Sequence, residues 1–365
     1  MPAERLAVII PFFQQQPGIL ARALASVRRQ RIPSGWVIDV IVVDDGSPCR
    51  VDEETANLTF DGALKLRVIK QDNAGVAAAR NRGLDVAHPD TDLIAFLDSD
   101  DIWPASHLMR ATKAIAAGYD FYFTDSRRSG YYESYLRERA NETGSYIAEA
   151  DEKDSFSVMA SDKFIGLMLK EFPAQLSTVV YKRCLALTLR FNTQLKTAGE
   201  DLLFLCMLLA RANSVVFDQI NCVDCGTGLN MYHGNLRNDS PQFLAICVDE
   251  FYSRKIIDKQ VELSSTNKVI SNMAIKYYKR RLAIHTVRNT VKYPSRMTKA
   301  MTDLIRKDAA ATISLLLAIP LCVLTFIARK LIELVTAGDA RKKADEKEIP
   351  QKKIRTYKCR NKLDT

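Results

Sequence analysis

The sequence predicts an α/β protein in which a mainly parallel sheet is flanked by helices. Short apolar runs of five to eight residues alternate with stretches of helical periodicity in the first part of the chain, which is the pattern of repeated βαβ units. Polar clusters follow several of these runs directly, as expected where buried parallel strands end. Hydrophobic residues make up 47% and charged residues 26% of the 365 residues, which excludes wholesale disorder, a collagen and a polytopic membrane protein.

The same alternation gives the expected order of elements. Strands are expected at the short apolar runs, namely 6–10, 36–43, 64–69, 93–97, 120–123, 178–181 and 215–217. Helices are expected where apolar residues recur at helical spacing, namely 18–30, 74–86, 108–117, 164–169 and 200–212. The polar stretch 126–160 predicts a loop-rich insertion, and residues 241–308 are predicted to be mostly helical and basic.

The net charge of +9 hides a strong asymmetry along the chain. Residues 251–365 carry a formal net charge of +16, whereas residues 1–250 carry −7. A basic C-terminal third of this kind binds phosphates, either on nucleic acid or on anionic lipid. The N-terminus has no secretory signal pattern and the eight Cys residues are scattered, so the body of the chain is expected in the cytoplasm with reduced thiols.

An uncharged stretch within the basic third favours lipid as the partner. Residues 309–328 contain no charged side chain, and these 20 residues just reach the length that a helix needs to cross a bilayer. Pro320 would kink such a helix, and basic residues on both sides argue against a simple crossing under the positive-inside rule. A bent, re-entrant or in-plane membrane helix is therefore expected, with a buried core helix as the alternative.

Closely spaced carboxylates follow the fourth expected strand. Asp98-Ser99-Asp100 places two carboxylates two residues apart, with Asp101 directly after them. Such a pair can share one Mg²⁺ or Mn²⁺ ion that also binds a substrate diphosphate, or can divide its work between a metal and a ribose hydroxyl. The alternative is a capped turn, in which Asp and Ser are frequent.

Acidic residues stand at two further junctions between expected elements. Asp44-Asp45-Gly46-Ser47 follows the second strand, where a carboxylate could accept a hydrogen bond from a base N–H or a sugar hydroxyl, or could only cap a turn. Gly199-Glu200-Asp201 begins a buried helix, where an acid could be a general base or could only suit the helix dipole. The clusters that follow strands, including the one at Pro11, are expected to converge on one crevice because parallel strands end at one edge.

These motifs together resemble those of the family 2 glycosyltransferases, which have the nucleotide-diphospho-sugar transferase (GT-A) fold. The resemblance covers roughly residues 5–235 and is carried by five motifs in the family's order, namely 8–11, 44–47, Asn73-Ala74-Gly75 with Ala79-Arg80-Asn81, 98–101 and 199–201. Within the family the chain looks most like bacterial exopolysaccharide (succinoglycan-type) glucosyltransferases. That closer match uses segments 17–27, 228–233 and 238–244.

The resemblance implies that one group of these residues binds a nucleotide sugar. Asp44 would bond the uracil or ribose of a UDP-sugar, while Pro11 and the turn from Asn73 to Gly75 would line the nucleoside. Asp98 would contact the ribose or the sugar, with Ser99 beside it. Binding of the nucleotide sugar by these residues is therefore expected at the crevice.

The resemblance also implies a metal site and a catalytic base. Asp100 would hold Mg²⁺ or Mn²⁺ across the diphosphate, and Asp201 would be the base. His233 would be a further metal or diphosphate contact, or only a loop histidine. Arg237 would be a diphosphate partner because a guanidinium matches phosphate oxygens.

The reaction implied by these roles is an inverting hexosyl transfer. An acceptor hydroxyl, deprotonated by Asp201, would displace UDP in one step, so that an α-linked UDP-sugar, with glucose as the expected sugar, gives a β-linkage. The expected acceptor is a polyprenyl-diphosphate-linked oligosaccharide of exopolysaccharide synthesis. The other expected partner is an anionic membrane surface, at the cytoplasmic face of the inner (plasma) membrane of a bacterium, and no nucleic acid is expected.

Three regions are expected along the chain, and other functions stay open. The regions are a GT-A domain over 1–240, a helical extension over 241–308, and a membrane-associating segment with a basic tail over 309–365. The alternatives are a glycosyltransferase of lipopolysaccharide or capsule assembly, a nucleotide-sugar-binding protein without turnover, and a nucleic-acid-binding enzyme that uses the basic C-terminal third.

Overall fold

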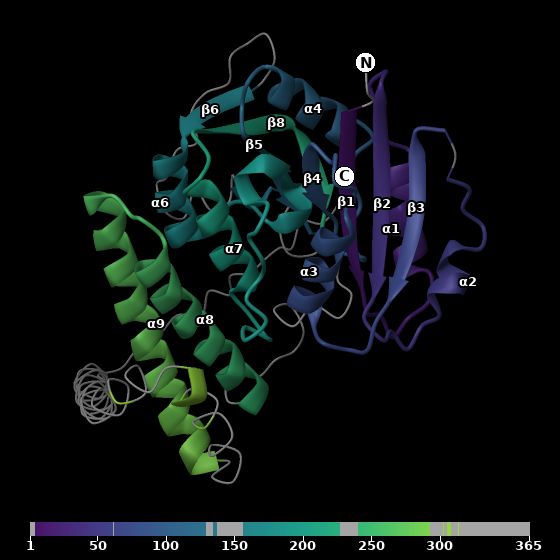
Figure 1. The fold of residues 1–365 in the computed structure, drawn as a ribbon. Helices are drawn as coiled ribbons and strands as arrows, with labels where there is room; N and C mark the ends of the chain where they lie inside the picture. The colour runs from purple at the N-terminus through teal and green to yellow at the C-terminus, as the bar shows by residue number, and fades with distance from the viewer. Residues whose placement is uncertain are drawn as a thin grey trace, which may run out of the picture.

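One eight-stranded sheet forms the centre of the part of the chain that the structure describes (Figure 1). This computed structural model describes residues 4–60, 62–128, 134–136, 156–226 and 240–292, together with 302, 305–307 and 313. The strands are β1 (Glu4–Phe12), β2 (Trp36–Asp44), β3 (Leu64–Lys70), β4 (Leu93–Phe96), β5 (Phe121–Arg127), β6 (Phe156–Ala160), β7 (Val179–Lys182) and β8 (Ser214–Asp224). The helices are α1 (Ile19–Arg28), α2 (Val51–Thr55), α3 (Val76–Val86), α4 (His107–Ala116), α6 (Ser161–Glu171), α7 (Glu200–Leu209), α8 (Pro241–Gln260) and α9 (Ser265–Lys292).

The order of strands in the sheet is β3-β2-β1-β4-β7-β5-β8-β6. Parallel pairing joins β1 to both β2 and β4, β2 to β3, and β5 to β8, whereas β7 and β6 run antiparallel to their neighbours. The prediction of a mainly parallel α/β sheet is thus confirmed. Since β1, β2 and β4 are parallel, their carboxyl ends lie at one edge, and the register pairs Phe12 with Asp44 there.

Two hydrophobic clusters cover the two faces of the sheet, and β1 contributes to both. Ala7 and Ile9 belong to the cluster that includes α3, α6 and α7, while Leu6 and Val8 belong to the cluster that includes α1 and α4. This division follows from the alternation of side chains along a strand. The continuous apolar character of the predicted strands is therefore explained by burial on both faces.

Helix α3 lies unusually close to β1. A Cβ atom added at Gly83 would come within 2.3 Å of the Cγ2 atom of Ile9. Ala77 and Ala79, on the same helix, are buried in the cluster that contains Ile9. Small residues therefore allow α3 to approach the sheet, which places Arg80 within reach of the strand ends.

Two elements differ from the sequence prediction for physical reasons. Strand β6 lies within the stretch 126–160, which was expected to be loop-rich, and it pairs antiparallel with β8 at the edge of the sheet. An edge strand of five residues shows little periodicity by itself, and its pairing partner lies far along the chain. Helix α2 is also only five residues long, too short to show helical spacing. The rest of that stretch, apart from residues 126–128 and 134–136, lies outside the described residues.

The predicted helical extension is present as α8 and α9, and it packs on the rest of the fold. Ile256 and Ile257 of α8 are buried in the same hydrophobic cluster as α7, and α9 packs against α6 and α8. The division into 1–240, 241–308 and 309–365 stays a prediction. Residues 309–328, apart from 313, lie outside the described residues, and within the described part no helix has the length and apolar character needed to cross a membrane.

Candidate active site

The turn after β2 is held to the turn before α3 by one buried carboxylate. Asp45 is 3% exposed. Its Oδ1 accepts hydrogen bonds from the Nε2 atom of Gln71 and the backbone N–H of Ala74, both at 2.8 Å, and its Oδ2 accepts from the N–H of Gly75 at 2.9 Å. Gly75 has φ of 91°, in the region that favours glycine, and is the residue before α3. Asp45 therefore fixes the turn that contains Asn73 and Gly75.

Gln14, just after β1, connects the turns after β2 and β4. Its backbone N–H donates to the Oγ atom of Ser47 at 3.0 Å, and its side-chain Nε2 donates to the Oγ atom of Ser99 at 3.0 Å. Ser99 is buried, and Asp44 accepts a hydrogen bond from the N–H of Ser47 at 2.8 Å. The structure thus brings the turn of Asp44 and the turn of Asp98 together at the carboxyl edge of the sheet, as expected.

The turn after β4 concentrates negative charge. Its ends are close, because the N–H of Asp101 donates to the carbonyl of Asp98 at 3.0 Å. Burial raises the pKa of Asp101 well above its usual range, and the Asp98 and Asp100 carboxylates raise it further. Hydrogen bonds from the Ser177 hydroxyl and from the N–H of Gly226 act in the opposite direction. This turn therefore carries several carboxylates close together.

A buried arginine joins this turn to the start of α7. The guanidinium of Arg80 donates to Asp98 at 2.8 Å and to Glu200 at 3.0 Å, and Arg80 is only 4% exposed. Burial disfavours the charged form, but the Asp98 and Glu200 carboxylates outweigh this effect and hold the pKa of Arg80 above its usual value. Arg80 therefore stays charged and connects two elements that are more than a hundred residues apart in the sequence.

The two acids at the start of α7 have different surroundings. Burial and the neighbouring Asp201 carboxylate raise the pKa of Glu200 to about 7, against the opposing effect of Arg80. Burial likewise raises the pKa of Asp201, while Arg80 lowers it and Asp98 raises it. Glu200 forms an ion pair with Arg80, whereas Asp201 is half-buried. Asp201 is thus the acid of this pair that lies partly open next to the charges of Arg80 and Asp98.

The loop that leads into α7 is anchored to two helices. Asn81 of α3 accepts from the N–H of Phe191 at 2.7 Å and donates to its carbonyl at 2.9 Å. Asp249 of α8 accepts from the N–H groups of Lys196 and Thr197 at 2.9 and 2.8 Å. Gly199, with φ of 81°, packs so closely on α8 that an added Cβ would lie 2.5 Å from the Ser253 hydroxyl. Asp201 therefore begins a helix whose approach is fixed from both sides.

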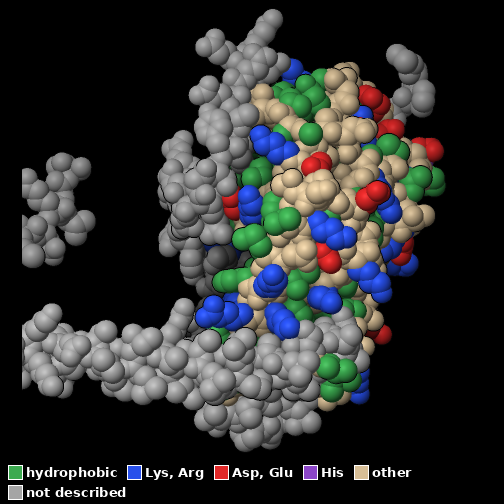
Figure 2. Space-filling model, turned by 90° about the vertical axis from the view of Figure 1, so that its left-hand side faces the viewer, with side chains coloured by type: hydrophobic (Ala, Val, Ile, Leu, Met, Phe, Trp, Pro, Cys, Tyr) green, Lys and Arg blue, Asp and Glu red, His purple; other side chains and the backbone are tan. Residues whose placement is uncertain are grey.

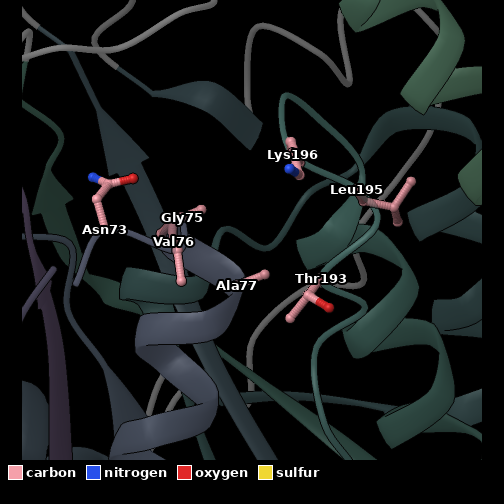
Figure 3. A pocket seen from close by; sticks show the side chains of 8 residues that line it. Asn73, Gly75, Val76, Ala77, Thr193, Leu195 and Lys196 are labelled. Carbon is pink, nitrogen blue, oxygen red and sulfur yellow. The ribbon is translucent and has the colours of Figure 1, made fainter. Parts of the chain in front are cut away.

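A pocket of about 260 Å³ lies between the start of α3 and this loop. It is lined by Asn73, Ala74, Gly75, Val76, Ala77, Thr193, Leu195 and Lys196. Figure 3 shows Ala77 and Thr193 on opposite sides, with Lys196 on the loop side. Ala77, which lines the pocket, lies three residues before Arg80 on α3, so these two residues share one side of that helix.

Most of the predicted site residues are placed by the structure at this edge. Pro11 is buried at the end of β1, Asn73 and Gly75 line the pocket, and Asp100 follows β4. The predicted residues His233 and Arg237 lie outside the described residues. The individual binding and catalytic roles remain predictions.

Several residues that organise the site were not assigned a role from the sequence. Arg80 and Asn81 belong to a motif that carried the family resemblance, so that motif was the available signal. Asp45 stands next to Asp44, and nothing in the sequence shows that Asp45 is the carboxylate that holds the turn before α3. Ser177 donates to Asp101 and receives a hydrogen bond from the N–H of Asp98, but it lies in a segment without a recognisable motif.

Comparisons with known proteins agree with this fold. The family model "Glycosyl transferase family 2" matches residues 7–170. The "Succinoglycan biosynthesis protein ExoW" of Rhizobium meliloti (strain 1021) is 37% identical over 246 residues, which are 66% of this chain and 74% of that protein. The chain belongs to glycosyl transferase family 2, and it is therefore a glycosyltransferase.

Solved structures support the GT-A fold. The mannosyltransferase PcManGT from Pyrobaculum calidifontis, in complex with GDP-Man and Mn²⁺, matches with a TM-score of 0.52 at 16% identity over 95% of this chain and 88% of that chain. S. aureus TarS 1–349 in complex with UDP-GlcNAc matches with a TM-score of 0.50 at 18% identity over 83% and 81% of the two chains. At these identities the likeness concerns the fold alone.

The role of Asp45 leads to a stability prediction. Asp45→Ala removes a carboxylate that accepts three hydrogen bonds, so three donors of the Gln71–Gly75 turn lose their partner. We expect a loss of about 2–4 kcal/mol in the free energy of unfolding, measured by urea denaturation. Asp52→Ala is the matched control, because Asp52 is 60% exposed and pairs with Lys70 at the surface, where we expect less than about 1 kcal/mol. Equal losses in the two variants would contradict this role.

Proposed function

We propose that the chain transfers glucose from UDP-glucose to a lipid-linked oligosaccharide of exopolysaccharide biosynthesis, with inversion to a β-linkage. The observation that carries the proposal is that Arg80, bound to Asp98 and to Glu200, places Asp98 next to Asp201 at the carboxyl edge of the sheet. Asp98 is predicted to contact the sugar donor, and Asp201 is the predicted base. The likeness to a succinoglycan biosynthesis protein supports the exopolysaccharide setting.

The donor would bind across the ends of β1, β2 and β4. Asp44 would accept a hydrogen bond from the uracil or ribose, with Pro11 nearby, and Asn73 and Gly75 would place the nucleoside beside the pocket. Asp98 would contact the ribose or sugar, because its side chain is 39% exposed while Arg80 holds one of its oxygens. The buried hydroxyl of Ser99 would support this turn through Gln14.

The acceptor hydroxyl would lose its proton to the Asp201 carboxylate as it attacks the anomeric carbon. Burial raises the pKa of this carboxylate, and Arg80 offsets part of that rise, which favours the ionised form that can accept a proton. The C–O bond to UDP breaks on the opposite face while the new glycosidic bond forms, which inverts the configuration. The mechanism needs only one base, so the role of Glu200 would be to hold Arg80 in place.

The residues present fit a hard divalent cation. Mg²⁺ is usually held by one or two carboxylates together with substrate phosphates, and the turn after β4 offers such an oxygen donor in Asp100. Besides burial, the Asp98 and Asp100 carboxylates raise the pKa of Asp101, and a cation at this turn would offset that crowding of negative charge. The described residues contain no cluster of three or more side chains that would form a complete cage, so substrate oxygens would complete the site. Mg²⁺ or Mn²⁺ held there would offset the charge of the departing diphosphate, with His233 and Arg237 as proposed further contacts.

The acceptor and the membrane setting are supported by charge. The +16 of residues 251–365 and the uncharged stretch 309–328 suit attachment to an anionic membrane at the cytoplasmic face, where a polyprenyl-diphosphate-linked acceptor would be available.

Asp201→Asn tests the catalytic base. We expect kcat to fall about 10²–10⁴-fold, because an amide cannot accept the proton, while the affinity for UDP-glucose, measured by calorimetry, changes little. Asp52→Asn, another first-turn aspartate, is the control and should keep full turnover. Wild-type turnover in Asp201→Asn would leave Asp201 as a helix-capping residue only.

Arg80→Met tests the electrostatic link between Arg80 and the base. Removing the guanidinium takes away the group that lowers the pKa of Asp201, so the pKa rises further and the carboxylate is protonated at higher pH. The acid limb of the kcat–pH profile should therefore move to higher pH, and Arg80→Lys should restore part of the shift. Arg190→Met removes a partly exposed arginine that pairs with Asp85 and should leave the limb in place. An unshifted limb in Arg80→Met would mean that Asp201 does not set the profile.

The metal proposal predicts a dependence on divalent ions. Turnover should be lost in excess EDTA and return with Mg²⁺ or Mn²⁺, because the departing diphosphate needs compensation of its charge. Asp100→Ala should lose the metal-dependent part of donor binding in calorimetry. Asp90→Ala, whose side chain is 83% exposed, should behave as wild type. Full activity in excess EDTA would rule the proposal out.

A further inference from the structure

One face of helix α9 packs against the rest of the fold. Asn267 donates to the Asp162 carboxylate of α6 at 2.8 Å, and Ser271 donates to Asp258 of α8 at 3.1 Å. Arg281 pairs with the buried Glu250 of α8 at 2.7 Å, and Leu282 is fully buried between these helices. These contacts determine which side of α9 faces outward.

The outward face carries a stripe of large apolar side chains. Val269, Met273 and Tyr277 are 59%, 66% and 62% exposed. Their spacing of four residues places them one above another along a single side of the helix. Apolar side chains gathered in this way on a protein surface mark a contact site rather than ordinary scatter. We call these three residues the α9 stripe.

Basic side chains border the α9 stripe on one side. With 100° of rotation per residue, Lys276, Lys279 and Lys268 lie at increasing angles from one side of the α9 stripe around the helix. Arg280 lies within the stripe itself. Lys268, Lys276 and Arg280 are exposed, and α9 contains no acidic residue. Figure 2 looks onto the side of the molecule where α9 lies and shows Lys and Arg side chains interleaved with hydrophobic ones over its lower half.

We propose that this face of α9 docks on an anionic lipid surface. An apolar stripe beside a basic edge is the composition of a helix that lies in the plane of a membrane interface. A second copy of the chain fits poorly, since two such faces would bring positive charges together without any acidic partner on either helix. This proposal adds a second contact to the membrane attachment proposed above. It rests on that proposal for its partner, an anionic membrane.

The position of α9 in the fold agrees with such docking. It runs along one side of the molecule toward the end at which β1, β2 and β3 terminate (Figure 1). Ile305 and Ile313, which follow it in the sequence, are 52% and 61% exposed. Docking through α9 would therefore hold the catalytic edge near a lipid-linked acceptor and would not depend on residues 309–328 alone.

The test uses the full chain and sedimentation with vesicles. We compare the wild type with the triple variant Val269→Ser, Met273→Ser and Tyr277→Ser, on vesicles of phosphatidylcholine with about a third phosphatidylglycerol. We expect the triple variant to bind at least about tenfold more weakly, because the apolar groups that enter the interface are lost. The matched control replaces Val158, Leu187 and Ile220 by Ser; these residues are 45%, 59% and 60% exposed elsewhere, and binding should not change.

A charge variant tests the basic edge separately. Lys268→Gln, Lys276→Gln and Arg280→Gln should weaken binding to the anionic vesicles and reduce its dependence on salt, while binding to pure phosphatidylcholine stays the same. Circular dichroism of each variant checks that the helices remain intact, as expected for exposed positions.

The outcomes separate this inference from the proposed attachment. If the wild type binds the vesicles but the stripe variant binds equally well, docking through α9 is wrong, and attachment through residues 309–328 still stands. If the wild type itself does not bind, both ideas fail. If the stripe variant instead changes the oligomeric state seen by light scattering and leaves vesicle binding unchanged, a second copy occupies this face and the inference is overturned.

Discussion

The ion bridge of Arg80 is the interaction on which the candidate site depends. A buried guanidinium without partners would be very costly, and here it is balanced by carboxylates from the turn after β4 and from the start of α7. The same contacts fix the position of α7 relative to the sheet, because Glu200 is the first residue of that helix. Breaking one side of such a bridge typically costs about 3–5 kcal/mol, since an uncompensated charge is left inside the protein. The charges that position the start of α7, where the predicted base Asp201 lies, thus also stabilise the fold.

Other polar side chains repeat this arrangement around the site. Asp45 holds the turn before α3, Asn81 holds the backbone of Phe191, and Asp249 holds the backbone of Lys196 and Thr197. Each is a side chain that satisfies backbone groups of a loop that would otherwise need water. The loops at the carboxyl edge are therefore fixed before any substrate arrives, and a fixed site loses less free energy when it has to orient a donor and an acceptor.

The sequence predicted the sheet class and the meeting of the motifs well, because both follow from local patterns. Alternating strands and helices imply parallel strands, and parallel strands bring Asp44 and Asp98 to one edge. It could not predict that Arg80 joins Asp98 to Glu200, since that contact depends on how closely α3 approaches β1 at Gly83. Strand β6 was missed for a related reason: its partner β8 is distant in the sequence, and only the folded sheet brings them together.

Helix α8 links the candidate active site to the side of the molecule that carries α9. Asp249 and Glu250 are neighbours on α8, yet Asp249 holds the loop before α7 while Glu250 pairs with Arg281 of α9. Asp249 also contacts Lys307, beyond the end of α9. Because one buried turn of α8 carries both sets of contacts, the loop before Asp201 and the outward face of α9 are connected through well-packed structure. A surface that α9 contacts would therefore hold the loop before Asp201 at a fixed orientation to that surface, because both α9 and this loop pack on α8.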